Sequence, residues 1–306
     1  MKINLKEENI LSRMEKPGSA HQLAFFRIFL GLQIFYSSGS RLFQLSDNVS
    51  VPDGTKNIFP DILNQFIDAT AVPYLQMITQ VLSIFLLMGL LTKYILPLLS
   101  ISFLFLFSFY YARNNAPNAW LYIWFPLLLL NFTRCSDVLS LDKYFSLLKQ
   151  QTNSLSNVYR WPIEVVAAWF AYIYVAAGVA KLLPLYKGWS WMQGGTIQEI
   201  MYNRFLDSFF FYLFGKPLFD YTEHYWIFTM LSIASIAIEF ICILILFTHR
   251  FHGLIIALVL GMHFFLYLSG VMGFMQLAII LSITLIQPGF FNKLFKERET
   301  PVTQAV

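Results

Sequence analysis

The chain has 306 residues, a formal net charge of +4, and a composition that is 57% hydrophobic, 18% aromatic and only 12% charged. Soluble domains carry about 25% charged residues, so this composition and the mean hydropathy of +0.59 predict an integral membrane protein. Basic runs with interleaved aromatic residues, which would bind nucleic acid, are absent, and two cysteines provide neither a disulfide framework nor a cysteine-rich metal site.

The chain begins with a charged segment, 1–20, that lacks the apolar core of a signal peptide and is expected to lie as an amphipathic helix on the cytoplasmic face. Apolar runs then predict eight membrane-spanning helices, at about 21–40, 73–91, 94–111, 118–132, 161–183, 228–248, 251–269 and 272–286. The last two could instead form one bent unit. The aromatic stretch 184–226 predicts interfacial helices between the fifth and sixth spans. The expected fold is all-α and polytopic, with a membrane domain at 21–290 and a cytoplasmic tail at 291–306.

The distribution of basic residues predicts the orientation. With a cytoplasmic N-terminus, thirteen of the 21 Lys and Arg residues fall in inner segments and six in outer segments, and two lie inside spans. The positive-inside rule therefore places both termini in the cytoplasm. The protein is expected in the cell membrane, and specifically in the inner membrane of a bacterium.

Several polar side chains fall inside the predicted spans, where a rise of about 1.5 Å per residue gives each a depth. Lys181, His263, Gln276 and Asn118 come to a similar depth in the outer half, which predicts one shared cavity. Arg27 and Glu239 lie deeper and are expected to support the fold, with an ion pair as one arrangement. Ionisable residues inside a membrane are functional candidates by default.

Each candidate also has a structural reading. Lys181 lies near the end of its span and can extend to the outer interface. His263 can be a hydrogen-bonded packing residue, and Gln276 and Asn118 can be interhelical hydrogen-bond partners. The five histidines are scattered and form no ligand motif, so no metal site is predicted.

A lysine in an apolar cavity suggests a specific chemistry. Partial desolvation weakens its preference for the charged form, and a neutral amine can act as a general base toward a weakly acidic hydroxyl. A pocket within a membrane also suits a lipid-soluble quinol. The residues alone therefore point to an outer-leaflet pocket with Lys181 as the base.

Five segments resemble the horizontally transferred transmembrane domain, which is the membrane domain of vitamin K-dependent gamma-carboxylase. They are FFRIFLGL (Phe25–Leu32), NNAPNAWLYIWFPLLLL (Asn114–Leu130), YVAAGVAKLLPLYKGWSWMQGG (Tyr174–Gly195), IAIEF (Ile236–Phe240) and GMHFFLYLSGVMGF (Gly261–Phe274). The resemblance covers about residues 20–290. It implies that Lys181 deprotonates reduced vitamin K or menaquinone. The residues that we expect to bind or orient the substrate are His263, Asn118, Gln276 and Trp189.

Two departures narrow what the resemblance implies. Asn118 is followed by Ala119, where the carboxylase has a histidine assigned to carboxylation, and the chain ends soon after its last span, without the lumenal domain that engages a propeptide. Short bacterial relatives include a membrane protein needed to mature a secreted peptide toxin. The resemblance thus implies a carboxylase-like enzyme that oxidises a quinol and acts on an exported peptide. The alternative is a non-catalytic membrane partner in secreted-peptide maturation, export or immunity.

Overall fold

The computed structural model describes residues 9–39, 72–114, 121–145, 155–183, 191–217, 223–270 and 275–295, and the side chains at 107–114, 121, 155 and 292 are outside that description. The described residues are predominantly helical, which confirms the all-α fold class. Two strands of two residues each, β1 (Gly18–Ser19) and β2 (Leu155–Ser156), form a short antiparallel pair.

Each of the eight predicted spans overlaps a helix. These helices are α2 (Ala20–Gly39), α4 (Val72–Met88), α5 (Thr92–Asn114), α6 (Leu121–Leu130), α8 (Asn157–Leu182), α12 (Tyr225–Ile241), α13 (His252–Leu268) and α14 (Met275–Leu285). A 3₁₀ segment, η5 (Cys242–Leu246), extends α12. Among the described residues, α8 and the continuous α12–η5 are long and apolar enough to cross a membrane, and four further apolar helices are shorter. The two last predicted spans are separate helices.

The remaining elements are short. They are α1 (Ile10–Met14), α7 (Leu141–Tyr144), α10 (Gly195–Asn203), η4 (Phe205–Asp207), α11 (Phe209–Phe214) and α15 (Pro288–Leu294). Helices α10 and α11 fall in the stretch predicted to hold interfacial helices. Within the described residues, α1 begins after its N-cap Asn9 and ends before Pro17, a residue that offers no backbone N–H to continue a helix.

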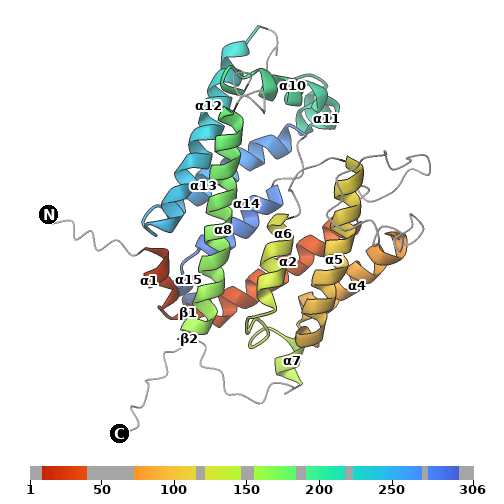
Figure 1. The fold of residues 1–306 in the computed structure, drawn as a ribbon. Coiled ribbons are helices and arrows are strands. Elements are labelled where there is room, and N and C mark those ends of the chain that lie inside the picture. Colours follow the sequence, from red (N-terminus) through yellow and green to blue (C-terminus); the bar gives the residue numbers. More distant parts are fainter. Residues whose placement is uncertain are drawn as a thin grey trace, which may run out of the picture. The chain divides into compact units, whose positions relative to one another are not determined.

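The chain divides into two compact units, shown in sequence colours in Figure 1. The first unit comprises 1–15 and 163–287, and the second unit comprises 16–162 and 288–306. Helix α8 begins in the second unit and continues into the first.

In the second unit, α2 packs against α4, α4 against α5, and α6 against both α5 and α2. Helices α2 and α4 approach closely at Gly31, where an added Cβ would lie 3.1 Å from the Leu87 side chain. Thr79 of α4 and Ser102 of α5 share a buried hydrogen bond of 2.5 Å between their hydroxyls. Small residues and buried hydroxyls at helix contacts are typical of helices that pack in a membrane.

In the first unit, α8 lies beside α12 and α13 (Figure 1), and side-chain hydrogen bonds join it to each of them. Helix α14 packs against α13, and α10 packs against α12. The contact between α10 and α12 is made by the buried side chains of Ile197, Met201 and Phe228. These contacts fix the three helices that carry the candidate site.

Candidate functional site

Lys181 and Glu239 form an ion pair between α8 and α12. The Lys181 Nζ lies 2.5 Å from Glu239 Oε1, and the side chains are 18% and 7% exposed respectively. Lys181 stands in the last turn of α8, and Glu239 in the last turn of α12 before η5. The lysine that the sequence identifies as the central candidate therefore faces a neighbouring helix.

The two helices come together at a glycine. Gly178 lies one turn before Lys181 on α8, and an added Cβ there would be 3.3 Å from both Glu239 Cβ and the ring of Phe240. Glycine inside a helix costs about 1 kcal/mol relative to alanine. Its presence here allows the close approach that brings Lys181 into contact with Glu239.

Trp191 covers the ion pair from a third segment. The Lys181 Nζ lies 4.7 Å from the centre of the Trp191 ring, within the range of a cation–π contact. The Trp191 backbone carbonyl accepts a hydrogen bond from the Ser232 hydroxyl of α12, and the neighbouring Gln193 carbonyl accepts one from Thr229, which together fix this segment to the helix. Sequence reasoning selected Trp189, which lies outside the described residues. The Trp-Ser-Trp pattern was the signal that also marked Trp191.

Glu239 retains one oxygen that the described protein does not satisfy. Its Oε1 accepts from Lys181, whereas Oε2 is buried and has no hydrogen-bond donor among the described residues. A buried acceptor left without a donor costs about 1–3 kcal/mol. The site therefore favours any bound molecule that brings a hydroxyl or another N–H or O–H donor to Oε2.

His263 reaches α8 through a tyrosine. Its Nε2 lies 2.7 Å from the hydroxyl of Tyr174, and both side chains are buried. Tyr174 precedes Lys181 by seven residues, about two helical turns, so both residues lie on the same face of α8. Tyr174 was not among the residues predicted from the sequence, although its seven-residue spacing from Lys181 is a signal that could have identified it.

An apolar groove of about 460 Å³ adjoins the same helices. It is lined by α8 and η5, with Ala176, Val179, Ala180, Leu183 and Ile243 among its residues. Ala180 and Leu183 bracket Lys181 in the sequence. The groove has room for a hydrocarbon chain, but neither Lys181 nor Glu239 is among the residues that line it.

The other predicted site residues do not all gather here. Asn118 lies outside the described residues. Gln276 is half-buried at the start of α14, and within the described part of the chain it forms no hydrogen bond with Lys181, Glu239 or His263. The described structure thus links Lys181 with Glu239 and His263 with Tyr174; the first three of these residues were predicted from the sequence, and Tyr174 was not.

The expected ion pair between Arg27 and Glu239 is replaced by other contacts. Arg27 belongs to the second unit, where its guanidinium donates to the backbone carbonyls of Cys135 at 2.9 Å and Leu139 at 2.5 Å. Depth along a span indicates which residues share a level but not which direction their side chains face. Arg27 supports the fold by holding the segment after α6, while Glu239 pairs with Lys181.

A buried ion pair in the first unit was not predicted. The Arg13 side chain of α1 contacts Glu164 of α8 at 3.0 Å and donates to the Ile245 carbonyl at 2.6 Å. The charged N-terminal segment had suggested an amphipathic helix on the membrane face. Arg13 instead is 1% exposed and attaches α1 to the helices of the first unit.

In the described part of the chain, no group of three or more His, Cys, Asp or Glu side chains is arranged to hold a metal ion. Comparison with known proteins adds no constraint: no family model, curated protein or solved structure matches this chain.

Proposed function

We propose that the chain is a multi-pass protein of the cell membrane, with about eight spans, both termini in the cytoplasm and its outer half holding the Lys181 site. Two helices of sufficient length and hydropathy support this placement. The distribution of side chains supports it further: α4 exposes Tyr74, Met77 and Ile78 while burying Thr79 and Ser83. Apolar exteriors with hydroxyls turned inward suit helices surrounded by lipid.

Within that membrane protein we propose an enzyme resembling the membrane domain of vitamin K-dependent gamma-carboxylase, which acts on a lipid-soluble quinol. The observation that carries the proposal is the ion pair of Lys181 with Glu239, together with the unsatisfied Oε2. The apolar groove along α8 and η5 has room for the hydrocarbon tail of such a substrate. Reduced vitamin K and menaquinone have this combination of phenolic hydroxyls and tail.

The unsatisfied carboxylate oxygen distinguishes the two redox forms of such a substrate. A quinol carries hydroxyl groups that can donate to Glu239 Oε2, whereas the oxidised quinone offers acceptors alone. Hydrogen bonds to a charged group contribute about 1.5–3 kcal/mol. The site should therefore bind the reduced form more tightly.

The contact of 2.5 Å between Nζ and Oε1 provides a route for the proton. Transfer of one proton from Lys181 to Glu239 leaves a neutral amine, which can then accept the hydroxyl proton of the quinol. The resulting quinolate reacts with dioxygen as co-substrate, and the balanced products are an epoxide and water. Tyr174 lies about two turns from Lys181 along α8 and contacts His263 of α13, and these two side chains are expected to orient the ring.

The test is quinol turnover by the purified protein in detergent or nanodiscs. Reduced menaquinone or vitamin K is incubated with dioxygen, and epoxide and quinone are separated and quantified. The wild type should form epoxide, whereas Lys181→Ala should reduce the rate by at least about 100-fold, since general-base catalysis contributes 10²–10⁴-fold. Equal product from the wild type and the variant would exclude the base role, provided that both elute as folded protein.

A non-catalytic role in secreted-peptide maturation, export or immunity is the second candidate. The close packing of Gly178 on Glu239 favours it, because it indicates that the ion pair also fastens α8 to α12. Lys181→Met with Glu239→Leu removes the charges and keeps the packing. Full activity of the host pathway with this double variant, at normal protein levels, would favour the partner role over the enzyme.

A further inference from the structure

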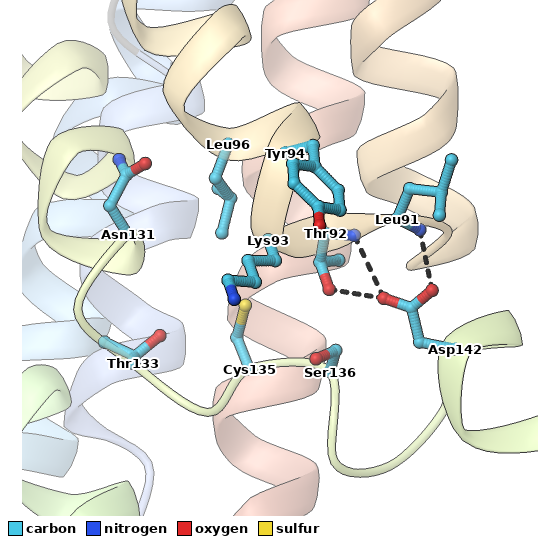
Figure 2. A pocket seen from close by; sticks show the side chains of 10 residues that line it. All are labelled: Leu91, Thr92, Lys93, Tyr94, Leu96, Asn131, Thr133, Cys135, Ser136 and Asp142. Carbon is cyan, nitrogen blue, oxygen red and sulfur yellow. Dashed lines mark hydrogen bonds between the residues drawn. The ribbon is translucent and has the colours of Figure 1, made fainter. Parts of the chain in front are cut away.

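The second unit contains a pocket of about 380 Å³ that the quinol proposal does not use. It lies between the start of α5 and the segment that follows α6 (Figure 2). Figure 2 shows Asn131 and Asp142 on opposite sides of the pocket, with Lys93 between them. The lining combines one basic, one acidic and several neutral polar side chains. The kind of ligand that fits the pocket therefore depends on which of these groups already have hydrogen-bond or ion-pair partners within the protein.

Asp142 is fully engaged by the protein. Its Oδ1 accepts from the Leu91 amide at 2.6 Å, and its Oδ2 accepts from the Thr92 amide at 2.9 Å and the Thr92 hydroxyl at 2.5 Å. These bonds satisfy the first amides of α5, where the helix dipole also favours a negative charge. Asp142 is buried and therefore serves the fold rather than a ligand.

Lys93 is the charged residue of the pocket whose side chain is available to pair with a ligand. Its side chain is exposed, and within the described part of the chain it forms no ion pair. With Asp142 satisfied, the accessible charge of the pocket is positive. An anionic group is the complementary ligand chemistry.

The neutral groups of the pocket need hydrogen-bond donors. Asn131 Nδ2 donates to Ser100 Oγ and to the carbonyls of Leu127 and Leu128, which fixes the orientation of the amide. Its Oδ1 is buried and has no donor among the described residues. Thr133 donates to the Leu130 carbonyl and retains acceptor capacity. The ligand should thus carry hydroxyls as well as a negative charge.

The surroundings of the pocket identify a lipid as the source. Leu91 and Tyr94, which line the pocket, are 46% and 64% exposed, and Leu98, one turn after Tyr94 on α5, is 55% exposed. The distribution of basic residues places the turn at Lys93 at the cytoplasmic membrane surface, where tyrosine and lysine commonly meet headgroups. This step rests on the membrane placement proposed above but not on the quinol chemistry.

We propose that this pocket binds an anionic phospholipid whose headgroup carries free hydroxyls, such as a glycerol headgroup. Lys93 pairs with the phosphate, and Asn131 and Thr133 accept from the headgroup hydroxyls. The acyl chains extend along the exposed apolar residues of α5.

Native mass spectrometry of the full chain in detergent tests the proposal through lipid affinities. Phosphatidylglycerol is compared with phosphatidylmethanol, which has the same charge and no free hydroxyl, and with phosphatidylcholine. Phosphatidylglycerol should bind at least about fivefold more tightly than either. Lys93→Gln should weaken its binding by about five- to tenfold, because one basic residue near a membrane surface contributes about 1 kcal/mol and a charge-assisted hydrogen bond somewhat more.

Lys216→Gln is the matched control, because it removes another exposed lysine from a different part of the chain. Equal affinity of wild type and Lys93→Gln would refute the pocket assignment. Equal binding of phosphatidylglycerol and phosphatidylmethanol would refute hydroxyl recognition, and tight binding of soluble glycerol phosphate would refute the lipid source. Quinol turnover of Lys93→Gln should equal that of the wild type, so a failure of either proposal is distinguishable from a failure of the other.

Discussion

At the residue scale, the pairing of Lys181 with Glu239 explains why two charged side chains persist in apolar helices. A single charge left buried without its partner is strongly destabilising, whereas a well-packed apolar replacement of the whole pair is often neutral. The contacts with Gly178 and Trp191 leave both side chains little freedom to move toward water. Replacing one member of the pair should therefore destabilise the protein more than replacing both members with apolar residues.

Lys181→Met should lower the free energy of unfolding by about 3 kcal/mol, because it leaves Glu239 buried and unpaired. The double variant Lys181→Met with Glu239→Leu should recover most of that loss. Thermal unfolding in detergent, with wild type and both variants in parallel, measures the difference. A double variant less stable than the single one would contradict this account of the pair.

Burial also alters the chemistry of a cysteine outside the predicted spans. Loss of solvent raises the pKa of the Cys135 thiol, although the nearby Arg27 charge opposes the shift. The thiolate is the form that reacts with alkylating reagents, so the alkylation rate rises with pH until the thiol is fully ionised. Because the pKa of Cys135 is higher in the folded protein, its alkylation rate there should still be rising at pH values where the rate in the unfolded chain has reached its plateau. Peptide mass spectrometry after iodoacetamide treatment at pH 7–10 checks this. Superimposable pH profiles for folded and unfolded chains would disprove the shift.

At the element scale, hydropathy predicted where the helices lie, because the apolar runs are bounded by Pro, Gly or charged residues. Among the described residues, α8 and α12–η5 alone are long and apolar enough to cross a membrane. It could not predict that Arg27 faces the carbonyls of Cys135 and Leu139. Counting residues along a span gives a depth, while partner choice depends on rotation about the helix axis and on neighbouring backbone. Lys181 and Glu239 were identified as candidates from the sequence, but their mutual contact required the structure.

The approach of α8 to α12 yields a graded prediction. Gly178→Ala should cost little, since a new Cβ at 3.3 Å requires its neighbours to move by a few tenths of an ångström. Gly178→Leu should separate the helices and lower the free energy of unfolding by about 1–3 kcal/mol, the usual cost of overpacking. Unfolding measurements on both variants test the contact, and equal stability of the two would rule out close packing at this position.

At the scale of the whole molecule, the distribution of basic residues predicts an orientation in the membrane. In a background with Cys135→Ser and Cys242→Ser, cysteines replace two exposed residues, Tyr144 and Lys216. A membrane-impermeant maleimide should label position 216 in intact cells and position 144 after lysis alone, because the positive-inside rule places them on opposite sides. Labelling of position 144 in intact cells would reverse the orientation and move the Lys181 site to the inner half.

The central claim is that the Lys181–Glu239 pair recognises the hydroxyl of a lipid-soluble quinol. Its most direct measurement is the anaerobic affinity of the purified protein for reduced and for oxidised menaquinone, compared with Lys181→Met, Glu239→Leu. The wild type should bind the reduced form at least about tenfold more tightly, in line with 1.5–3 kcal/mol for a hydrogen bond to a charged group, and the double variant should lose this preference. Equal affinity of the wild type for the two redox forms would contradict the claim.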